Sequence, residues 1–516
     1  MPIFDGNLPY TNFHELNLDW IISYVKSVKA KTDLIEESVL RAEERSEQAK
    51  FYAESIKDII LTPEMFGAIG DLIADDTDAI QEMFNNANGK LCVMSKKYKV
   101  TSLIINNLEN AIILGGIIES PSDPVRRTLI KLRQCKNVVF SDLTLKSTND
   151  QTAYNISGFT PLINAVSSNL IGILMEKCQY ITFNNLTETN MLIGIWLTKG
   201  TYDSYTNTGN KEIQFNNLIQ NGIFEGMHSD ESNGVNINNM IFDNTDLAVN
   251  PGYHGFYFER NSTKLYVNNL NADWSETSIY AFFDFADFGV WDAQLFKQEV
   301  LIENSYAYAP VLFTFNSRNK MMKAVNCEFK LKPFLQAGGT YDTVLRFIDV
   351  ANTDKNSGKY PTIIFENCSL LPDENITTSY LTRSTEYAKY YLENCDTKFR
   401  INTANVDATF KGCHITEILL FIFSTTAGTV KLIDCVWDAL YNSYVLASRS
   451  ATMDFKVYNS IINVGNHPFI NNGGTASDMT FYNTIFHSVG NVGAFQVDNG
   501  TGVTPINCYW NDALIV

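Results

Sequence analysis

Residues 271–292, NADWSETSIYAFFDFADFGVWD, form the most unusual stretch of the sequence, because aromatic rings alternate there with carboxylates. Two earlier phrases, GMHSDESN (226–233) and GYHGFYFERN (252–261), add histidines, tyrosines and further acids. Flat aromatic faces suit sugar rings, and carboxylates accept hydrogen bonds from hydroxyls. We therefore expect a glycan-contacting surface that includes Trp274, Trp291, Tyr253, Tyr257, His254 and Arg260.

Glycosidic hydrolysis needs two carboxyl groups, roughly 5–5.5 Å apart for retention or 6.5–9.5 Å apart for inversion. Equivalent positions on neighbouring rungs of a stacked β structure meet such distances. The candidate catalytic pairs are Asp230 or Glu231 with Glu259, and Asp273 with Glu276. In the alternative interpretation these acids are solvated loop residues, and the aromatic residues pack in a core or between subunits.

Other chemistries have little support in the sequence. The six histidines are scattered without metal-ligand spacing, so we expect no metal and no other cofactor. The sequence contains no phosphate loop, no G-x-S-x-G motif and no dinucleotide fingerprint. A formal charge of −18 argues against binding to nucleic acid or to anionic lipid. The longest apolar runs, 111–118 and 418–423, are too short to insert into a membrane.

A short repeated unit must position these side chains: two alternating apolar residues, then Asn or Asp, then a small, apolar or Cys residue. The polar position is occupied by Asn185, Asn217, Asn239, Asn269, Asn304, Asn326, Asn367, Asn394, Asp434, Asn459, Asn483 and Asn507, with Gly412 as a variant. The last spacings are 18, 22, 25, 24 and 24 residues. Periods in the twenties with strand alternation predict a mainly β solenoid, a parallel β-helix. An ordinary β-sandwich is the alternative.

Stacked rungs would explain the residue types in the repeat. Asn can donate and accept along a column and tolerates left-handed turns. Six of the nine cysteines follow the Asn position, as small residues that we expect to face the interior as free thiols. Disulfides between rungs are the alternative, which stacked geometry disfavours.

The sequence of the N-terminal region predicts a docking segment and a helix instead of solenoid rungs. Residues 1–20 contain Tyr10, Phe13, Leu16 and Trp20, which we expect to dock into another protein; a frayed terminus is the alternative. A 3–4 apolar repeat over residues 21–61 predicts a coiled coil, and its β-branched positions favour three strands. The alternative is an amphipathic helix lying on the protein's own body. No secretory signal is visible at the start, MPIFDGNLPY.

The phrase FGAIGD (66–71) followed by DDTDAIQ (75–81) resembles the opening of the pectate-lyase-like superfamily. In that superfamily it forms the cap and first rung of a right-handed parallel β-helix, which the resemblance implies for residues 62–100. Leu72 stands where the family usually has Gly, and the family's Pro-x-Gly-x-Tyr is replaced by Ser95, Lys96, Lys97 and Tyr98.

A coiled-coil stem ahead of such a cap is similar to bacteriophage tailspikes and tail appendages, which are homotrimers. NLPYTNFHELNLDWII (7–22) also resembles the virion-anchoring start of some phage tail proteins. The resemblance implies a homotrimer anchored by residues 1–20 to other virion tail or collar proteins. Residues 101–516 would contact host cell-wall or capsular glycan, with assembly in the host cytoplasm. The alternatives are a soluble, monomeric polysaccharide-degrading enzyme and a structural virion fibre without ligand.

Overall fold

The computed structural model separates the chain into two units, residues 1–59 and 60–516. In the second unit the structure describes residues 60–121, 128–148, 171–198, 209–230, 232–243, 254–259, 262–274, 281–286, 298–316, 320–335, 341–342, 344–350, 360–376, 378–382, 387–401, 406–416, 420–422, 428–439, 446–448, 453–465, 470–472, 478–488, 497–498, 503–511 and 513–515. In the first it describes residues 26, 28–29, 32–33, 36 and 38–47. No helix within these residues is long and apolar enough to cross a membrane.

The described residues of the first unit are helical, as the 3–4 repeat predicted. Their side chains are exposed, including those of Val28, Val39 and Leu40. The coiled coil and its three-stranded state stay predictions, but its predicted end at residue 61 is wrong, because Ile60–Leu61 is a strand that pairs within the second unit. The predicted docking residues Tyr10, Phe13, Leu16 and Trp20 lie outside the described residues.

The second unit begins with a cap made of β1 (Ile60–Leu61), η1 (Pro63–Phe66), β2 (Asp71–Asp75) and α2 (Thr77–Asn85). The Asp76 carboxylate accepts hydrogen bonds from the backbone amides of Ile69 and Gly70, at 2.7 and 3.1 Å, and so ties the FGAIGD turn to the start of α2. Leu72, which replaces the Gly usual in the pectate-lyase-like opening that this segment resembles, adopts a φ of 62°. A branched side chain in this left-handed region is strained.

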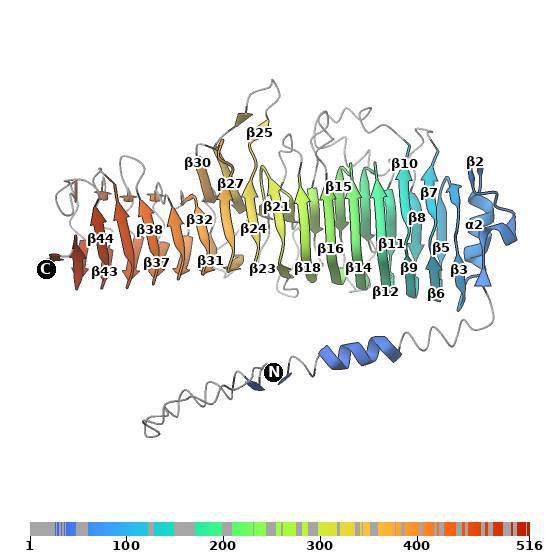
Figure 1. Ribbon diagram of the computed structural model, residues 1–516, viewed down its shortest axis with the longest axis horizontal. Coiled ribbons are helices and arrows are strands. Elements are labelled where there is room, and N and C mark those ends of the chain that lie inside the picture. Colours follow the sequence, from blue (N-terminus) through green and yellow to red (C-terminus); the bar gives the residue numbers. More distant parts are fainter. Residues whose placement is uncertain are drawn as a thin grey trace, which may run out of the picture. The chain divides into compact units, whose positions relative to one another are not determined.

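Behind the cap the chain forms a parallel β-helix, as the repeat predicted (Figure 1). A 31-stranded sheet bends into two lines, and an 11-stranded sheet closes the described rungs on a third side. The first line holds β3 (Leu91–Val93), β6 (Glu109–Leu114), β9 (Lys136–Ser141), β20 (Gln298–Glu303), β23 (Lys320–Val325), β28 (Thr362–Glu366), β31 (Ala388–Glu393), β34 (Val406–Lys411), β37 (Gly428–Ile433), β40 (Met453–Tyr458), β43 (Asp478–Tyr482) and β46 (Val503–Ile506).

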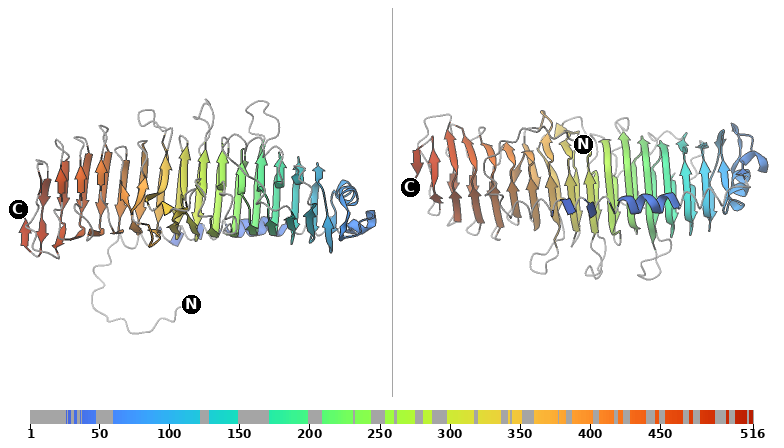
Figure 2. Two further views of the ribbon diagram at one scale, coloured as in Figure 1. Left: turned by 90° about the horizontal axis from the view of Figure 1, so that it is seen from above. Right: turned by 60° about the horizontal axis from the view of Figure 1, so that its bottom comes forward.

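The second line holds β4 (Lys97–Lys99), β7 (Ile117–Ser120), β10 (Thr144–Ser147), β21 (Tyr306–Ala309), β24 (Glu328–Leu331), β29 (Ser369–Pro372), β32 (Asp396–Lys398), β35 (His414–Thr416), β38 (Val436–Ala439), β41 (Ile461–Val464), β44 (Ile485–Ser488) and β47 (Cys508–Trp510). Four long strands run through both lines: β12 (Gln179–Thr189), β14 (Asn210–Asn221), β16 (Ser232–Asp243) and β18 (Lys264–Asp273). Figure 2 shows how regularly the rungs follow one another.

The 11-stranded sheet consists of β5 (Leu103–Asn106), β8 (Thr128–Arg133), β11 (Ile171–Glu176), β13 (Ile193–Thr198), β15 (Glu225–Ser229), β17 (His254–Glu259), β19 (Phe283–Ala286), β22 (Phe313–Asn316), β27 (Val344–Val350), β30 (Thr378–Thr382) and β33 (Arg400–Ile401). A separate sheet of β36 (Leu420–Ile422), β39 (Leu446–Ser448), β42 (Ile470–Asn472) and β45 (Val497–Asp498) follows. Two described pairings are antiparallel: β25 (Phe334–Leu335) with β26 (Tyr341–Asp342), and β48 (Ala513–Ile515) with β47.

The predicted asparagine column is confirmed at the bend between the two lines. Every Asn and Asp of the repeat has a φ between 48° and 57°, and Gly412 has a φ of 62°. Side-chain amides donate from rung to rung, for example from Asn459 to Asp434 at 3.3 Å and from Asn483 to Asn459 at 3.1 Å. The column therefore combines a backbone conformation that Asn tolerates with a ladder of side-chain hydrogen bonds.

The interior is one continuous cluster of apolar side chains supplied by all the walls. Aligned rings stack along the axis, such as Phe140 on Phe183 and Phe183 on Phe215, with centroids 4.8 and 5.2 Å apart. All nine cysteines are buried and free, so the prediction of interior thiols is confirmed. The Cys413 thiol lies 3.4 Å from the Leu392 carbonyl oxygen of the preceding rung, which places it as a weak donor along the stack.

Candidate functional site

The candidate site lies on the outer face of the 11-stranded sheet, where four strands share the pattern x-Gly-apolar-x. The glycines are Gly172, Gly194, Gly226 and Gly255, in β11, β13, β15 and β17. A Cβ on any of them would lie 2.2–2.6 Å from its nearest neighbouring atom. For Gly226 these neighbours include the Phe242 ring and Gln220 Oε1, on the opposite wall of the core. Only glycine fits this close approach of two walls.

The glycine changes the direction in which its neighbours point. In β15 both the missing Cβ of Gly226 and the side chain of Met227 face the core, since Met227 belongs to the core cluster. Residues three apart lie on opposite faces of a regular strand, but an extra inward residue brings Glu225 and His228 to the same outer face. The strand irregularity therefore creates the pair on which the site is built.

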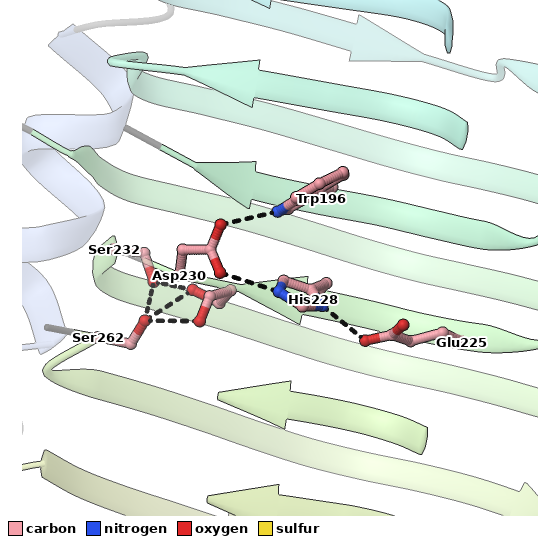
Figure 3. Close-up of polar contacts among 7 residues, drawn as sticks. Trp196, Glu225, His228, Asp230, Ser232 and Ser262 are labelled. Carbon is pink, nitrogen blue, oxygen red and sulfur yellow. Dashed lines mark hydrogen bonds and ion pairs between the residues drawn. The ribbon is translucent and has the colours of Figure 1, made fainter. Parts of the chain in front are cut away.

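Glu225, His228 and Asp230 form a hydrogen-bonded triad (Figure 3). His228 Nδ1 lies 2.8 Å from Glu225 Oε1, and His228 Nε2 lies 2.9 Å from Asp230 Oδ1. The other oxygen of Asp230 accepts a hydrogen bond of 3.1 Å from the indole Nε1 of Trp196, one rung earlier. Both ring nitrogens of His228 thus face carboxylate oxygens, an arrangement that favours the imidazolium form.

Burial strengthens the electrostatics of this triad. The side chain of Glu225 is 2% exposed, and those of His228 and Asp230 are 16% and 13% exposed. Burial alone would lower the pKa of His228, but the carboxylates of Glu225 and Asp230 raise it well above its ordinary value. The two carboxylates therefore favour the imidazolium form of His228.

A second histidine on the same face has the opposite character. Burial lowers the pKa of His254 to about 3, so this imidazole is neutral at neutral pH. Its Nδ1 lies 3.0 Å from the Ala281 carbonyl oxygen and must carry the proton, which leaves Nε2 as the acceptor. Nε2 approaches Asp284 Oδ2 at 3.5 Å, a contact that is not an ion pair while His254 is neutral.

Strand register joins the two histidines into one surface. Trp196, His228, Tyr257 and Asp284 occupy one column across β13, β15, β17 and β19. The Tyr257 ring contacts both imidazoles, with centroids 4.7 Å from His228 and 5.0 Å from His254. We call this set the outer polar cluster: Trp196, Glu225, His228, Asp230, His254, Tyr257 and Asp284.

Three buried serines fix the end of β15 beside Asp230 (Figure 3). Ser229 Oγ lies 2.6 Å from Ser232 Oγ and 2.8 Å from Ser262 Oγ, and the Ser262 hydroxyl donates to the Ser229 carbonyl oxygen at 3.1 Å. These contacts hold two neighbouring rungs together, so we assign the serines a positioning role. Within the described residues no three His, Cys, Asp or Glu side chains are arranged to hold a metal ion.

The structure brings together part of the predicted site. Asp230, His254 and Tyr257 belong to the outer polar cluster, although His254 and Tyr257 are only 1% and 6% exposed. Ser229 pairs with Phe258, so Asp230 and Glu259 follow paired positions on neighbouring rungs. The predicted residues Tyr253, Glu231, Arg260, Glu276 and Trp291 lie outside the described residues, as does the Glu259 side chain.

Two predicted residues lie elsewhere. Asp273 belongs to the 31-stranded sheet and forms an ion pair with Lys332, whose Nζ lies 2.7 Å from Asp273 Oδ1. Trp274 was expected to contact a sugar, but its side chain is fully buried and packs against Phe242 and Phe282. That prediction is wrong, because the aromatic residues described in 271–292 fill the core where two walls approach closely.

Sequence reasoning missed Trp196 and Glu225 as site residues. The signal was present in IGIWL (193–197), EGMHS (225–229) and HGFYF (254–258), where Gly recurs at spacings of 32 and 29 residues. Aligning the strands on this Gly would have placed Trp196, His228 and Tyr257 in one column. The Asn repeat marks the bend of the 31-stranded sheet, so it does not align the strands of the 11-stranded sheet that carry the site.

Comparison with known proteins gives one sequence relative and several structural likenesses. The capsule K30/K69-specific depolymerase of Klebsiella phage K64-1 is 39% identical over 105 residues, which cover 18% of this chain and 14% of the depolymerase. The chain thus matches only about a seventh of that relative's length. No protein-family model matches the sequence.

Among solved structures, the N-terminal fragment of bacteriophage phi29 gene product 12 has a TM-score of 0.45 at 12% identity, covering 87% of this chain and 93% of that one. Tailspike protein 3 of bacteriophage CBA120 has a TM-score of 0.40 at 9% identity, covering 89% and 62%. At these values neither likeness carries a functional argument. The parallel β-helix and the depolymerase match together support a tailspike-like protein.

Proposed function

We propose that this chain is a phage tail appendage whose β-helix binds a host cell-surface polysaccharide at the outer polar cluster. The observation that carries the proposal is the convergence of carboxylates, imidazoles and aromatic rings from β13, β15, β17 and β19 on one outer face. Similarity to a phage capsule depolymerase supports a glycan as the ligand class.

The cluster offers the contacts that a sugar needs. Carboxylates held by an imidazolium are fixed acceptors for hydroxyl groups, and their geometry is set before any ligand arrives. The half-buried Trp196 ring supplies apolar surface for a sugar ring beside these acceptors. Because Asp230 binds both His228 and the Trp196 indole, the polar and aromatic contacts are held in one arrangement.

Cleavage of the bound polysaccharide is a second candidate function, favoured by the register of β15 and β17. Asp230 and Glu259 follow paired positions one rung apart, a separation of about 4.8 Å between neighbouring strands. This spacing is near the roughly 5–5.5 Å between the two carboxyl groups of retaining glycosidases. In this proposal Asp230 and Glu259 are the catalytic pair, and His228 and Trp196 position the Asp230 carboxylate.

The mode of attachment is part of the same proposal. Residues 1–20 dock on other virion tail proteins, and a coiled coil built on the helix described between residues 26 and 47 joins three copies. The exposed apolar side chains Val28, Val39 and Leu40 support self-association, because a solitary helix would leave them in water.

The test uses the full chain with purified capsular and cell-wall polysaccharides from candidate hosts. Retention of the protein on immobilised polysaccharide measures binding, and new reducing ends measure hydrolysis. We expect Trp196→Ala to weaken binding at least tenfold, and Asp230→Asn to abolish any release of reducing ends. His414→Ala is the matched control, because His414 also lies between two carboxylates but on a different wall.

Wild-type chain that binds no polysaccharide in the panel would contradict the proposed function. Binding without reducing ends or unsaturated products would exclude cleavage and leave a binding protein. Unchanged melting of each variant, followed by circular dichroism, separates a local effect from misfolding.

A further inference from the structure

Two polar side chains lie in the apolar core, on the inner side of the sheet that carries the outer polar cluster. Glu188 in β12 and Gln220 in β14 occupy paired positions on neighbouring rungs, and both are 0% exposed. The paired position holds Leu145 on the rung before them and Phe242 on the rung after them, so the polar pair is local. Polar groups are costly in such surroundings unless their hydrogen bonds are made, so the pair calls for a reason beyond packing.

Gln220 joins this pair to the strand on which the triad is built. Its Nε2 donates to Glu188 Oε2 at 2.6 Å and to the Gly226 carbonyl oxygen at 3.1 Å. Gly226 lies between Glu225 and His228 in β15, at the irregularity that brings these two side chains to one face. Both N–H groups of the Gln220 amide are therefore used, one within the pair and one on the backbone of the site.

The register of β15 explains why Gly226 needs a partner inside the core. The pairing with β17 passes from Glu225 directly to Met227, so Gly226 stands outside the regular register. A residue outside the ladder leaves its peptide groups without their regular partners. A backbone carbonyl group buried in an apolar core must find a donor there, and Gln220 supplies one.

Glu188 stands in a similar relation to β13, the preceding strand of the site. Its Oε1 and the Gly194 carbonyl oxygen lie 2.6 and 2.7 Å from one point, the position that a Cβ on Gly172 would take. Oε1 has no hydrogen-bond partner within the described part of the chain. An ionised Glu188 would bring two acceptors together there, whereas the neutral acid can donate its O–H to the carbonyl group.

Burial favours the neutral form of this acid. It raises the pKa of Glu188 to about 8, so the carboxyl group keeps its proton at neutral pH. The pair then offers one donor to each of two backbone carbonyl groups, the Glu188 hydroxyl to Gly194 and the Gln220 amide to Gly226.

These two carbonyl groups lie at equivalent places before two residues of the outer polar cluster. Gly194 is two residues before Trp196, and Gly226 is two residues before His228. Trp196 and His228 both bind the Asp230 carboxylate, one through each of its oxygens (Figure 3). A shift of either strand at its glycine would therefore separate side chains that must meet at one carboxylate.

We propose that Glu188 and Gln220 are positioning residues of the outer polar cluster, which act from inside the core on the backbone of β13 and β15. Neither side chain reaches the outer face where a ligand would bind, since both are fully buried. The inference rests on the proposed function only for what the cluster binds. The arrangement itself belongs to the free protein, so it can be tested without a ligand, and its failure is distinguishable from a failure to bind polysaccharide.

Replacement of Gln220 in the full chain tests the positioning role through the protonation of His228. Diethyl pyrocarbonate modifies neutral imidazole, so its reaction rate with His228 at pH 7 reports how firmly the two carboxylates hold the imidazolium. Gln220→Met removes the amide at similar length. Gln214→Met is the matched control, because Gln214 is half-buried in the same strand and donates to Asn216 Oδ1 at 2.9 Å, away from the core.

We expect His228 to react at least about tenfold faster in Gln220→Met, which corresponds to a fall of one unit in its pKa. Its rate in Gln214→Met should equal that of wild type, and His414 in the same digest is the internal reference. An unchanged His228 rate in folded Gln220→Met would overturn the proposal, as would equal acceleration in both variants.

Glu188 provides a second test that decides the matter if Gln220→Met does not fold. Glu188→Gln keeps an N–H donor for the Gly194 carbonyl group, whereas Glu188→Met has similar length and no donor. We expect the wild-type His228 rate in Glu188→Gln and a rate at least about threefold higher in Glu188→Met, the effect of losing one ordinary hydrogen bond. Equal rates in these two variants would overturn the proposal, because the donor would then have no part in placing the site. Thermal melting followed by circular dichroism establishes that the compared variants are folded.

Discussion

Among the described residues, His228 and His414 each lie between two carboxylates, and they differ in how the fold supplies those acids. His228 takes both from its own rung, Glu225 and Asp230, because the irregularity at Gly226 brings residues three apart to one face. His414 takes one from each neighbouring rung, with Asp396 Oδ1 at 3.1 Å from Nδ1 and Asp438 Oδ2 at 2.8 Å from Nε2.

The second arrangement follows directly from stacking, since any outward column places side chains from successive rungs about 4.8 Å apart. The first requires a specific change in the strand and a close approach of two walls. The difference in burial is equally large: the His228 side chain is 16% exposed and the His414 side chain 48%. We infer that His414 forms ordinary surface ion pairs, whereas the His228 triad is a site that the fold forms through a specific strand irregularity.

Replacing the two histidines should give the largest difference. His228→Leu leaves two mostly buried carboxylates without their cation, and breaking a buried pair in this way costs roughly 3–5 kcal/mol. His414→Leu removes exposed pairs and should cost less than about 1 kcal/mol. Midpoints of guanidinium unfolding, compared with wild type, measure both. Equal costs for the two variants would show that the His228 triad is no more buried in solution than the His414 pairs.

Glu188 extends the comparison, because it is a buried acid that forms no ion pair within the described part of the chain. It is 0% exposed, its Oε2 accepts a hydrogen bond of 2.6 Å from Gln220, and burial raises its pKa to about 8. The folded state holds the proton that the unfolded chain loses above its ordinary pKa of 4.5. This contribution to stability is therefore complete below about pH 4.5 and is lost as the pH rises toward 8.

Glu188→Gln should remove that pH dependence, which is worth about 1.4 kcal/mol for each pH unit in this window. We expect the variant to be more stable than wild type at pH 7, by about 3 kcal/mol, and similar at pH 4.5. Unfolding midpoints at pH 4.5, 6 and 8 provide the measurement. Parallel pH profiles for the two proteins would mean that Glu188 is ionised inside the fold.

The sequence predicted the stacking well and the site only partly, for a physical reason. Asn459 and Cys413 have one role on every rung, so their positions repeat and the repeat can be seen. Trp196 and Glu225 are each used once, and what repeats is the glycine beside them. The prediction for Trp274 was wrong because an indole next to acids in the sequence is equally compatible with an exposed sugar-binding ring and with a buried core ring. Only the distance between opposite walls distinguishes these two.

The pH at which each imidazolium loses its proton should also differ between His414 and His228. Of the differences predicted here, this one involves the smallest free energy. Hydrogen bonding to Asp438 raises the pKa of His414, although its exposure limits the contribution to a few tenths of a kcal/mol, roughly. Because the folded pKa is raised, this stability is present below the ordinary pKa of 6.5 and is lost as the pH rises through the folded value. Diethyl pyrocarbonate, which modifies neutral imidazole, reports the titration when modified peptides are read by mass spectrometry.

We expect modification of His414 to rise with a midpoint above pH 6.5, and modification of His228 to begin only at a higher pH, because its two carboxylates stabilise the imidazolium. Asp438→Asn should move the His414 midpoint downward and leave His228 unchanged, which makes it the internal control. Modification of His228 at or below the pH that modifies His414 would mean that the buried triad holds its proton no better than the exposed one. Its carboxylates would then no longer be fixed in place for a ligand.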